Sequence, residues 1–194
     1  MSIVMNISTA FILISLSAWF SSLITQQAKL RWLVVAIAII LSLIIPVVDS
    51  NIWLWVNGAV GELSIVSLIL LAGFILRKLA AWNMLSSSTR LHIYFLILLA
   101  GALLFPATLG LTQFDPYALG YSFELSLLLL SLSILYWTFN QRQMSIILLI
   151  VVAVDQAGIL SSINSWDYLI DPLLWLFSPV MLIILLMVKR KAAS

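Results

Sequence analysis

Residues 142–156 have the sequence RQMSIILLIVVAVDQ, in which an apolar run separates a basic residue from a carboxylate. The run Ile146–Val152 shows none of the polar and apolar alternation that marks a membrane-spanning β-strand. A helix needs about 20 apolar residues to cross the hydrocarbon core of a bilayer. The nine apolar residues Ile146–Val154 are too few for a crossing, so the stretch predicts a membrane helix that either carries Asp155 and Gln156 into the bilayer or breaks there.

The same order of charges extends along the whole chain. Basic and acidic residues alternate as blocks, and an apolar stretch separates each block from the next. The basic blocks are Lys29 and Arg31; Arg77, Lys78 and Arg90; Arg142; and Lys189, Arg190 and Lys191. The acidic blocks are Asp49 and Glu62; Asp115 and Glu124; and Asp155, Asp167 and Asp171. The positive-inside rule then predicts an N-terminus outside the cell and a cytoplasmic C-terminus.

The composition indicates that lipid is the solvent for most of the chain. Of its 194 residues 64% are hydrophobic and 8% are charged, whereas a soluble domain carries about 25% charged residues. We expect one integral membrane domain, residues 1–194, in the plasma (cell inner) membrane. The positive-inside rule accounts for the net charge of +2, so nucleic acid is not an expected partner.

Seven apolar segments are long enough, or nearly long enough, to span the membrane. They are residues 5–24, 32–48, 55–76, 91–111, 119–139, 145–161 and 173–188. The predicted fold is all-α, a polytopic transmembrane bundle of about seven helices arranged as three hairpins plus one helix. Glu-Leu-Ser occurs at 62–64 and again at 124–126, each near the start of a segment, and whether this is a true repeat stays open.

Depth along the helices separates the carboxylates into two groups. At 1.5 Å per residue, Glu62 lies about 22 Å from Arg77, and Asp155 about 20 Å from Arg142. Because the hydrocarbon core is about 30 Å thick, both carboxylates are expected inside its outer half. Asp49, Glu124 and Asp171 lie about 27 Å from their nearest basic residues, close to the outer interface.

Carboxylates within a bilayer are costly and therefore face the bundle interior, pair with polar groups or take up a proton. We predict a polar site for a ligand or proton in the outer half. Its candidate residues are Asp155, Glu62, Glu124, Gln156, Asn57 and Tyr121. The alternative is that these groups satisfy one another and the backbone groups freed by proline, or that a tilted helix leaves Asp155 in water. Gly158 would permit a helix break after Asp155 or a close contact with another helix.

Aromatic side chains are expected to anchor the bundle at the two membrane interfaces. The anchors predicted from their position along the segments are Trp53, Trp55, Trp137 and Trp166.

Few cofactors suit this composition. The chain has no cysteine and a single histidine, His92, so bis-histidine haem and Cys/His metal sites are not expected. Seven helices match the count of microbial rhodopsins, but residues 173–188 lack the lysine that would hold retinal. Carboxylate-only metal binding by Glu62, Asp155 and Glu124 stays open. No cofactor is predicted.

Three functions remain in competition. The first is a transporter or channel that handles a proton, a cation or a neutral molecule, because the outer side has carboxylates and no Lys or Arg to attract an anion. The second is a non-catalytic subunit or assembly partner of a larger membrane complex, or a homo-oligomer. The third, ranked lower, is an intramembrane enzyme that acts on a lipid-linked substrate with paired carboxylates.

Overall fold

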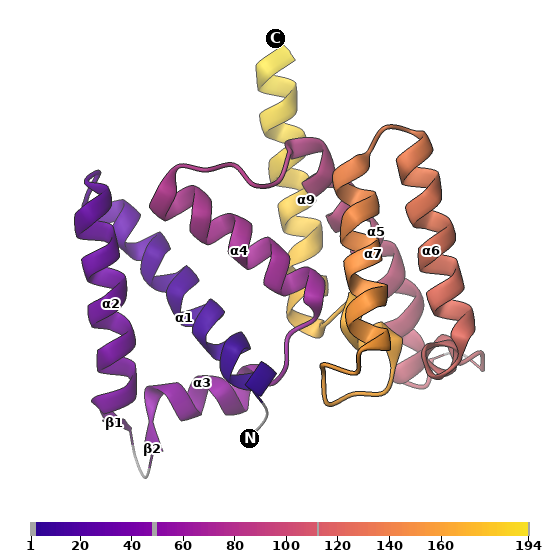
Figure 1. The fold of residues 1–194 in the computed structure, drawn as a ribbon, viewed down its shortest axis with the longest axis horizontal. Helices are drawn as coiled ribbons and strands as arrows, with labels where there is room; N and C mark the ends of the chain where they lie inside the picture. Colours follow the sequence, from indigo (N-terminus) through magenta and orange to yellow (C-terminus); the bar gives the residue numbers. More distant parts are fainter. Residues whose placement is uncertain (1–2, 48–49, 112, 194) are drawn as a thin grey trace. The chain divides into compact units, whose positions relative to one another are not determined.

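The computed structural model describes residues 3–47, 50–111 and 113–193 (Figure 1). It is 80% helical with almost no strand, which confirms the expectation of an all-α chain. The helices are α1 (Ile3–Ile24), α2 (Ala28–Ile44), α3 (Ile52–Val60), α4 (Ile65–Ala80), α5 (Ser87–Thr108), the 3-10 helix η1 (Pro116–Tyr121), α6 (Phe123–Thr138), α7 (Arg142–Gln156), α8 (Ser165–Leu169) and α9 (Pro172–Ala193). The two-residue strands β1 (Pro46–Val47) and β2 (Ser50–Asn51) pair antiparallel. Asp49 lies outside the described residues.

The chain divides into two compact units. Unit 1 comprises Met1–Leu63 and Leu68–Met84, and unit 2 comprises Ser64–Ser67 and Leu85–Ser194. The division falls within α4, whose first turn belongs to unit 2.

Unit 1 is built on α1 and α2, which lie side by side and run in opposite directions (Figure 1). Its core contains Ala18 of α1, Val35 of α2 and Leu79 of α4, with Ile14 and Ile75 packed against them. The small Ala18 side chain, which is fully buried, lets the helices approach closely. Helix α3 lies across the end of this pair (Figure 1).

The predicted third segment, residues 55–76, is two helices in the structure. Helix α3 ends at Val60 and α4 begins at Ile65. Gly61 between them has φ 67°, a conformation that a residue with a Cβ adopts only at a cost and that a right-handed helix excludes. The Leu63 amide donates to Ser8 Oγ at 2.9 Å, so a side chain of α1 replaces one lost helical hydrogen bond. The sequence pattern missed this break because hydropathy averaged over residues 55–76 does not report a backbone angle.

Unit 2 contains two antiparallel helix pairs. Helices α6 and α7 are joined by a short turn and pack along their length (Figure 1). Helices α5 and α9 form the second pair, in which Gly101 near the end of α5 lies against Trp175 near the start of α9. A Cβ on Gly101 would stand 2.1 Å from Trp175 Cδ1, so only glycine permits this approach. Helices η1 and α8 lie at the end of unit 2 where α6 begins and α7 ends.

Three helices are long and apolar enough to cross a membrane, among the residues that the structure describes. They are Ile3–Ile24, Ser87–Ala107 and Pro172–Lys191. Helices α2, α4, α6 and α7 have 17, 16, 16 and 15 residues, which is short for a hydrocarbon core of about 30 Å.

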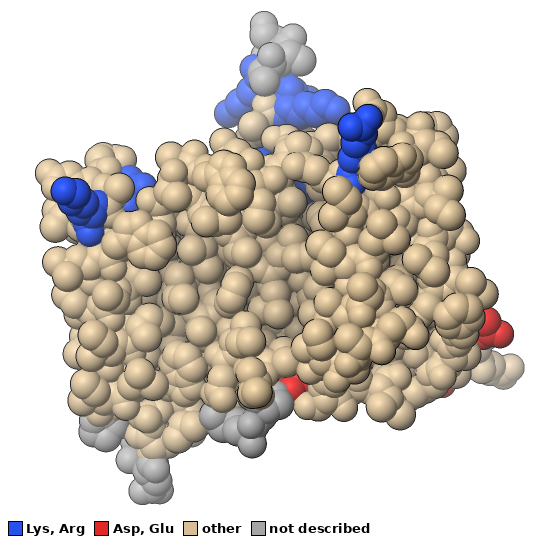
Figure 2. Space-filling model, viewed as in Figure 1, with Lys and Arg blue, Asp and Glu red and all other residues tan. Residues whose placement is uncertain are grey.

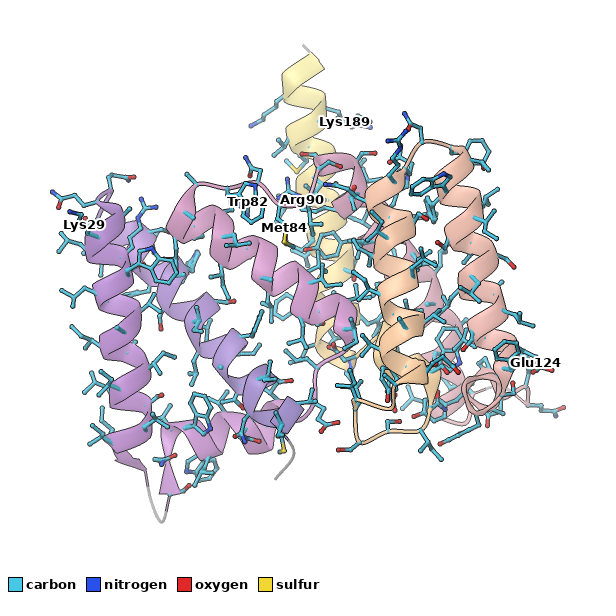
Figure 3. All side chains as sticks on the ribbon, viewed as in Figure 1. Lys29, Trp82, Met84, Arg90, Glu124 and Lys189 are labelled. Carbon is cyan, nitrogen blue, oxygen red and sulfur yellow. The ribbon has the colours of Figure 1, made fainter. Side chains whose placement is uncertain are left out.

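Each unit separates its charges along the helix axes. In unit 1, Arg31 donates to the carbonyl of Lys78 at 2.8 Å, which brings the basic residues of α2 and α4 to one end (Figure 2). In unit 2, Arg90 and Lys189 lie at one end and Glu124 at the other (Figure 3). The side-chain amide of Gln143 joins that basic end to the start of α5, where it accepts from the Ser86 amide at 3.0 Å.

Candidate functional site

Asp155 stands on the last turn of α7, where a glycine ends the helix. The Gly158 amide donates to the Asp155 carbonyl at 2.9 Å, and the Ile159 amide donates to the Val154 carbonyl at 3.4 Å. Gly158 has φ 61°, so the three features together form a Schellman motif. The break that Gly158 was expected to permit is therefore present, and the chain turns away immediately after the carboxylate.

One oxygen of Asp155 is surrounded by hydrogen-bond donors from three elements. Oδ2 accepts from Ser165 Oγ of α8 at 2.7 Å and from Ser126 Oγ of α6 at 3.3 Å. Gln156 Nε2 makes a longer contact with the same oxygen at 3.5 Å. Oδ1 accepts no hydrogen bond from the described residues. The carboxylate is thus held by one oxygen and presents the other.

The half-buried Asp155 carboxylate lines a cleft of about 440 Å³ in unit 2. The cleft is bounded by Gly120, Tyr121, Ser122, Phe123, Ser126, Asp155, Gln156, Gly158, Leu160, Ser162, Ile163, Ser165 and Tyr168. Asp155 is the single charged residue among them, and no Lys or Arg contributes to the lining. The volume lies within the range of small-molecule sites, about 300–1,000 Å³. The charge of the cleft selects against anions.

A hydrogen-bonded loop forms the wall of the cleft opposite α6 and α7. Tyr117 of η1 donates to both oxygens of Asp167 at 3.0 and 3.1 Å, and Ser162 Oγ donates to Asp167 Oδ2 at 2.5 Å. Burial, and then the hydrogen bond to Asp167, raise the pKa of Tyr117 well above its ordinary value. The Tyr117 hydroxyl therefore remains protonated and keeps η1 bound to the loop after α7.

The same loop docks against η1 through two further side chains. The buried indole of Trp166 donates to the Pro116 carbonyl at 2.9 Å, and Asn164 Nδ2 donates to the Tyr117 carbonyl at 3.0 Å. A Cβ on Gly120 would stand 1.9 Å from Asn164 Oδ1, so this position requires glycine. These contacts hold the loop against η1 in addition to the hydrogen bond that Ser165 donates to Asp155.

The structure brings together three of the six predicted ligand-site residues. Asp155, Gln156 and Tyr121 all line the cleft. Glu124 starts α6 outside the lining, where its carboxylate accepts from Ser122 Oγ at 2.7 Å. Sequence reasoning missed Ser126 and Ser165, because only the packing of α6 and α8 against α7 reveals them as donors to Asp155.

The other two predicted residues belong to unit 1. Asn57 of α3 is 1% exposed and donates through Nδ2 to Asn6 Oδ1 at 3.1 Å. Glu62 is half-buried in the loop between α3 and α4. Asn57 has a structural role, since Asn6 also accepts from the Trp53 indole at 3.4 Å and so joins α1 to α3.

The four predicted anchors differ in exposure. Trp55 and Trp137 are about half exposed, and the Arg142 guanidinium lies 5.7 Å from the centroid of the Trp137 ring. Trp53 is half-buried. Trp166 is 5% exposed and packs inside unit 2, because its ring fills the space beside η1 and its N–H has a carbonyl partner there. Loop composition cannot show which tryptophan has such a partner.

Asp171 is a buried carboxylate whose surroundings the sequence did not reveal. Its Oδ2 accepts from the amide and hydroxyl of Ser64 at 3.0 and 2.8 Å and from Ser67 Oγ at 2.6 Å. Its Oδ1 accepts from the Leu174 amide at 2.9 Å and caps α9. The Asp-Pro start of α9 is a recognisable capping signal, but the two serines are distant in sequence. All its oxygens are engaged, so Asp171 is structural.

No group of three or more His, Cys, Asp or Glu side chains suited to a metal ion occurs within residues 3–47, 50–111 and 113–193. The carboxylates named above are dispersed over separate loops and helix ends. Comparison of the chain with protein-family models, with curated proteins and with solved structures gave no match.

Proposed function

We propose that this protein is a multi-pass membrane protein that binds and transports a small cation or neutral polar molecule through the cleft at Asp155. The observation that supports this most directly is the carboxylate itself. It stands on the last turn of an apolar helix, lines a cleft of small-molecule size and keeps one oxygen without a protein donor among the described residues. A charge in such a position is costly to maintain and is a mark of a functional site in membrane proteins.

The proposed topology has seven crossings, made by α1, α2, α4, α5, α6, α7 and α9. Helix α3, of 9 residues, is too short to cross and is assigned to the outer interface, where Trp55 is exposed. The short crossings α2, α4, α6 and α7 are accommodated by local thinning of the bilayer and by their polar flanks. The basic ends are cytoplasmic in this arrangement, and the plasma (cell inner) membrane is the proposed location.

The absence of cysteine from the chain makes the topology directly testable. Phe139, 70% exposed, lies in the turn after α6, and Ile163, 83% exposed, lies in the loop between α7 and α8. We expect a membrane-impermeant maleimide to label Ile163→Cys in intact cells and to label Phe139→Cys only after permeabilisation. Labelling of both residues from outside, or the reverse pattern, would contradict the proposed orientation.

Transport is tested with the purified full-length protein in liposomes that contain a pH-sensitive dye or a cation-sensitive dye. Replacing the Asp155 carboxylate by an amide removes a charged hydrogen-bonding group, so we expect Asp155→Asn to slow the flux at least about tenfold. Asp115→Asn is the matched control, because Asp115 is exposed, carries the same charge and lies outside the cleft. Equal flux for the wild type and Asp155→Asn would refute transport through this cleft.

The principal alternative is a non-catalytic subunit of a larger membrane complex. Purification in mild detergent with other membrane proteins at a fixed stoichiometry, together with flux that is insensitive to Asp155, would favour that role over transport.

A further inference from the structure

We infer that the cleft binds a small organic ammonium compound, with the ammonium group at Asp155 and the organic part against the aromatic rings of the lining. This inference rests on the proposed function and names the class of its ligand. It follows from the one charge in the cleft, the hydroxyl groups around that charge and the aromatic and aliphatic side chains that share the lining with them.

The first step is the sign and number of the charges. Asp155 contributes the one formal charge of the lining, and a lone carboxylate favours a monovalent cation. Ca²⁺ takes six to eight oxygen ligands and Mg²⁺ takes six, usually with more than one carboxylate. No set of three candidate metal-ligating side chains occurs in the described part of the chain. The cleft is therefore poorly suited to a divalent metal ion.

The second step is the supply of hydrogen-bond acceptors. An ammonium group has three N–H donors. Asp155 Oδ1 accepts no hydrogen bond from the described residues. The hydrogen bonds to the other oxygen, Oδ2, fix the orientation of the carboxylate. The hydroxyls of Ser122 and Ser162 also line the cleft, and both donate their hydrogen to another carboxylate. Because their hydrogens are used in this way, both oxygens can act only as acceptors toward a ligand, and Ser162 Oγ already accepts one hydrogen bond from the Asn164 amide at 3.0 Å.

The third step is the aromatic and apolar wall. Tyr121 and Phe123 line the cleft with rings that are 59% and 60% exposed, and Leu160 and Ile163 contribute apolar side chains. An aromatic face attracts an organic cation and also covers its apolar part. A strongly hydrated inorganic cation would gain nothing from this wall. The combination of one carboxylate with aromatic rings favours an amine over Na⁺ or a proton alone.

The test uses benzylamine, a cation at neutral pH, and benzyl alcohol as its uncharged analogue, in isothermal titration calorimetry of the full-length protein in detergent. We expect saturable benzylammonium binding that Asp155→Asn weakens at least about tenfold and Asp115→Asn leaves unchanged. Tyr121→Ala, at an exposed ring, should also weaken benzylammonium binding while the helical circular dichroism stays that of the wild type.

The outcomes separate the ligand class from the proposed function. Benzyl alcohol binding as tightly as benzylammonium, or Mg²⁺ binding that depends on Asp155 while benzylammonium does not bind, would overturn the ammonium assignment. If flux in liposomes still requires Asp155 in either case, the proposed transport function stands and only the ligand class fails. Loss of both the Asp155-dependent binding and the Asp155-dependent flux would overturn both proposals.

Discussion

Replacing Asp171 by alanine should destabilise the protein far more than replacing an exposed aspartate. The change removes the cap on α9, worth about 1 kcal/mol. It also leaves the Ser64 amide and the hydroxyls of Ser64 and Ser67 without their acceptor, at about 1–3 kcal/mol for a buried polar group that stays unpaired. Because hydroxyls can rotate to a nearby carbonyl, we expect a total loss of about 3–5 kcal/mol in the free energy of unfolding.

The contributions can be separated with matched variants. Asp171→Ser retains an oxygen for the Leu174 amide and should recover about 1 kcal/mol of the loss. A double-mutant cycle of Asp171→Ala with Ser67→Ala should give a coupling energy of about 1–2 kcal/mol, because the two side chains share a hydrogen bond of 2.6 Å. Asp115→Ala is the control, since Asp115 is exposed and accepts one backbone amide, that of Tyr117.

The assay is reversible unfolding in mixed micelles, followed by far-ultraviolet circular dichroism. Helical signal reports the whole chain, so the Asp171 variants and the Asp115 control are compared under identical conditions. A loss for Asp171→Ala that equals the loss for Asp115→Ala, or a coupling energy of zero with Ser67→Ala, would refute the reasoning.

Three further perturbations test separate parts of unit 2. Gly101→Ala should destabilise the α5–α9 pair, because the new Cβ would stand 2.1 Å from the Trp175 indole. The double variant with Trp175→Ala should therefore lose less free energy of unfolding than the two single variants added together. Gly158→Ala should cost about 1–2 kcal/mol in thermal unfolding, since φ is 61° there, and an unchanged unfolding temperature would argue against the motif that ends α7. The pKa of Tyr117 is raised in the folded state, so its stabilising contribution is complete below the ordinary tyrosine pKa of 10.0 and declines as the pH rises above it. Alkaline unfolding measured at several pH values should show this decline in the wild type and lose it in Tyr117→Phe.

Asp155 illustrates how far the sequence could lead toward the site. Its position after a nine-residue apolar run was sufficient to single it out and to predict that the helix either carries it into the membrane or breaks there, and the structure shows the break. Its hydrogen-bond partners Ser126 and Ser165 could not be found in the same way. Serines are frequent in this chain, and only the packing of α6 and α8 decides which two meet the carboxylate.

Gly61 and Trp166 show the opposite case. The apolar pattern across residues 55–76 predicts one helix, because hydrophobicity does not report a backbone angle, whereas the structure has positive φ at Gly61 and two helices. The residue type of Trp166 and its position along the chain predicted an interface anchor, yet its ring is buried beside Pro116. Both differences arise from local contacts that composition and periodicity do not encode.

Sequence alone was sufficient for the helical class and for the order of charges along the chain, and three of the seven predicted segments correspond to described helices long and apolar enough to cross a membrane. These features depend on residue type and spacing, because hydrophobicity and charge act through their position relative to lipid and water. Tertiary structure alone decided that Asp155, Gln156 and Tyr121 share a cleft, that Glu124 lies outside its lining and that Asp171 is a buried cap. Such outcomes depend on which helix faces meet, and packing selects those faces through small residues and hydrogen bonds distant in sequence.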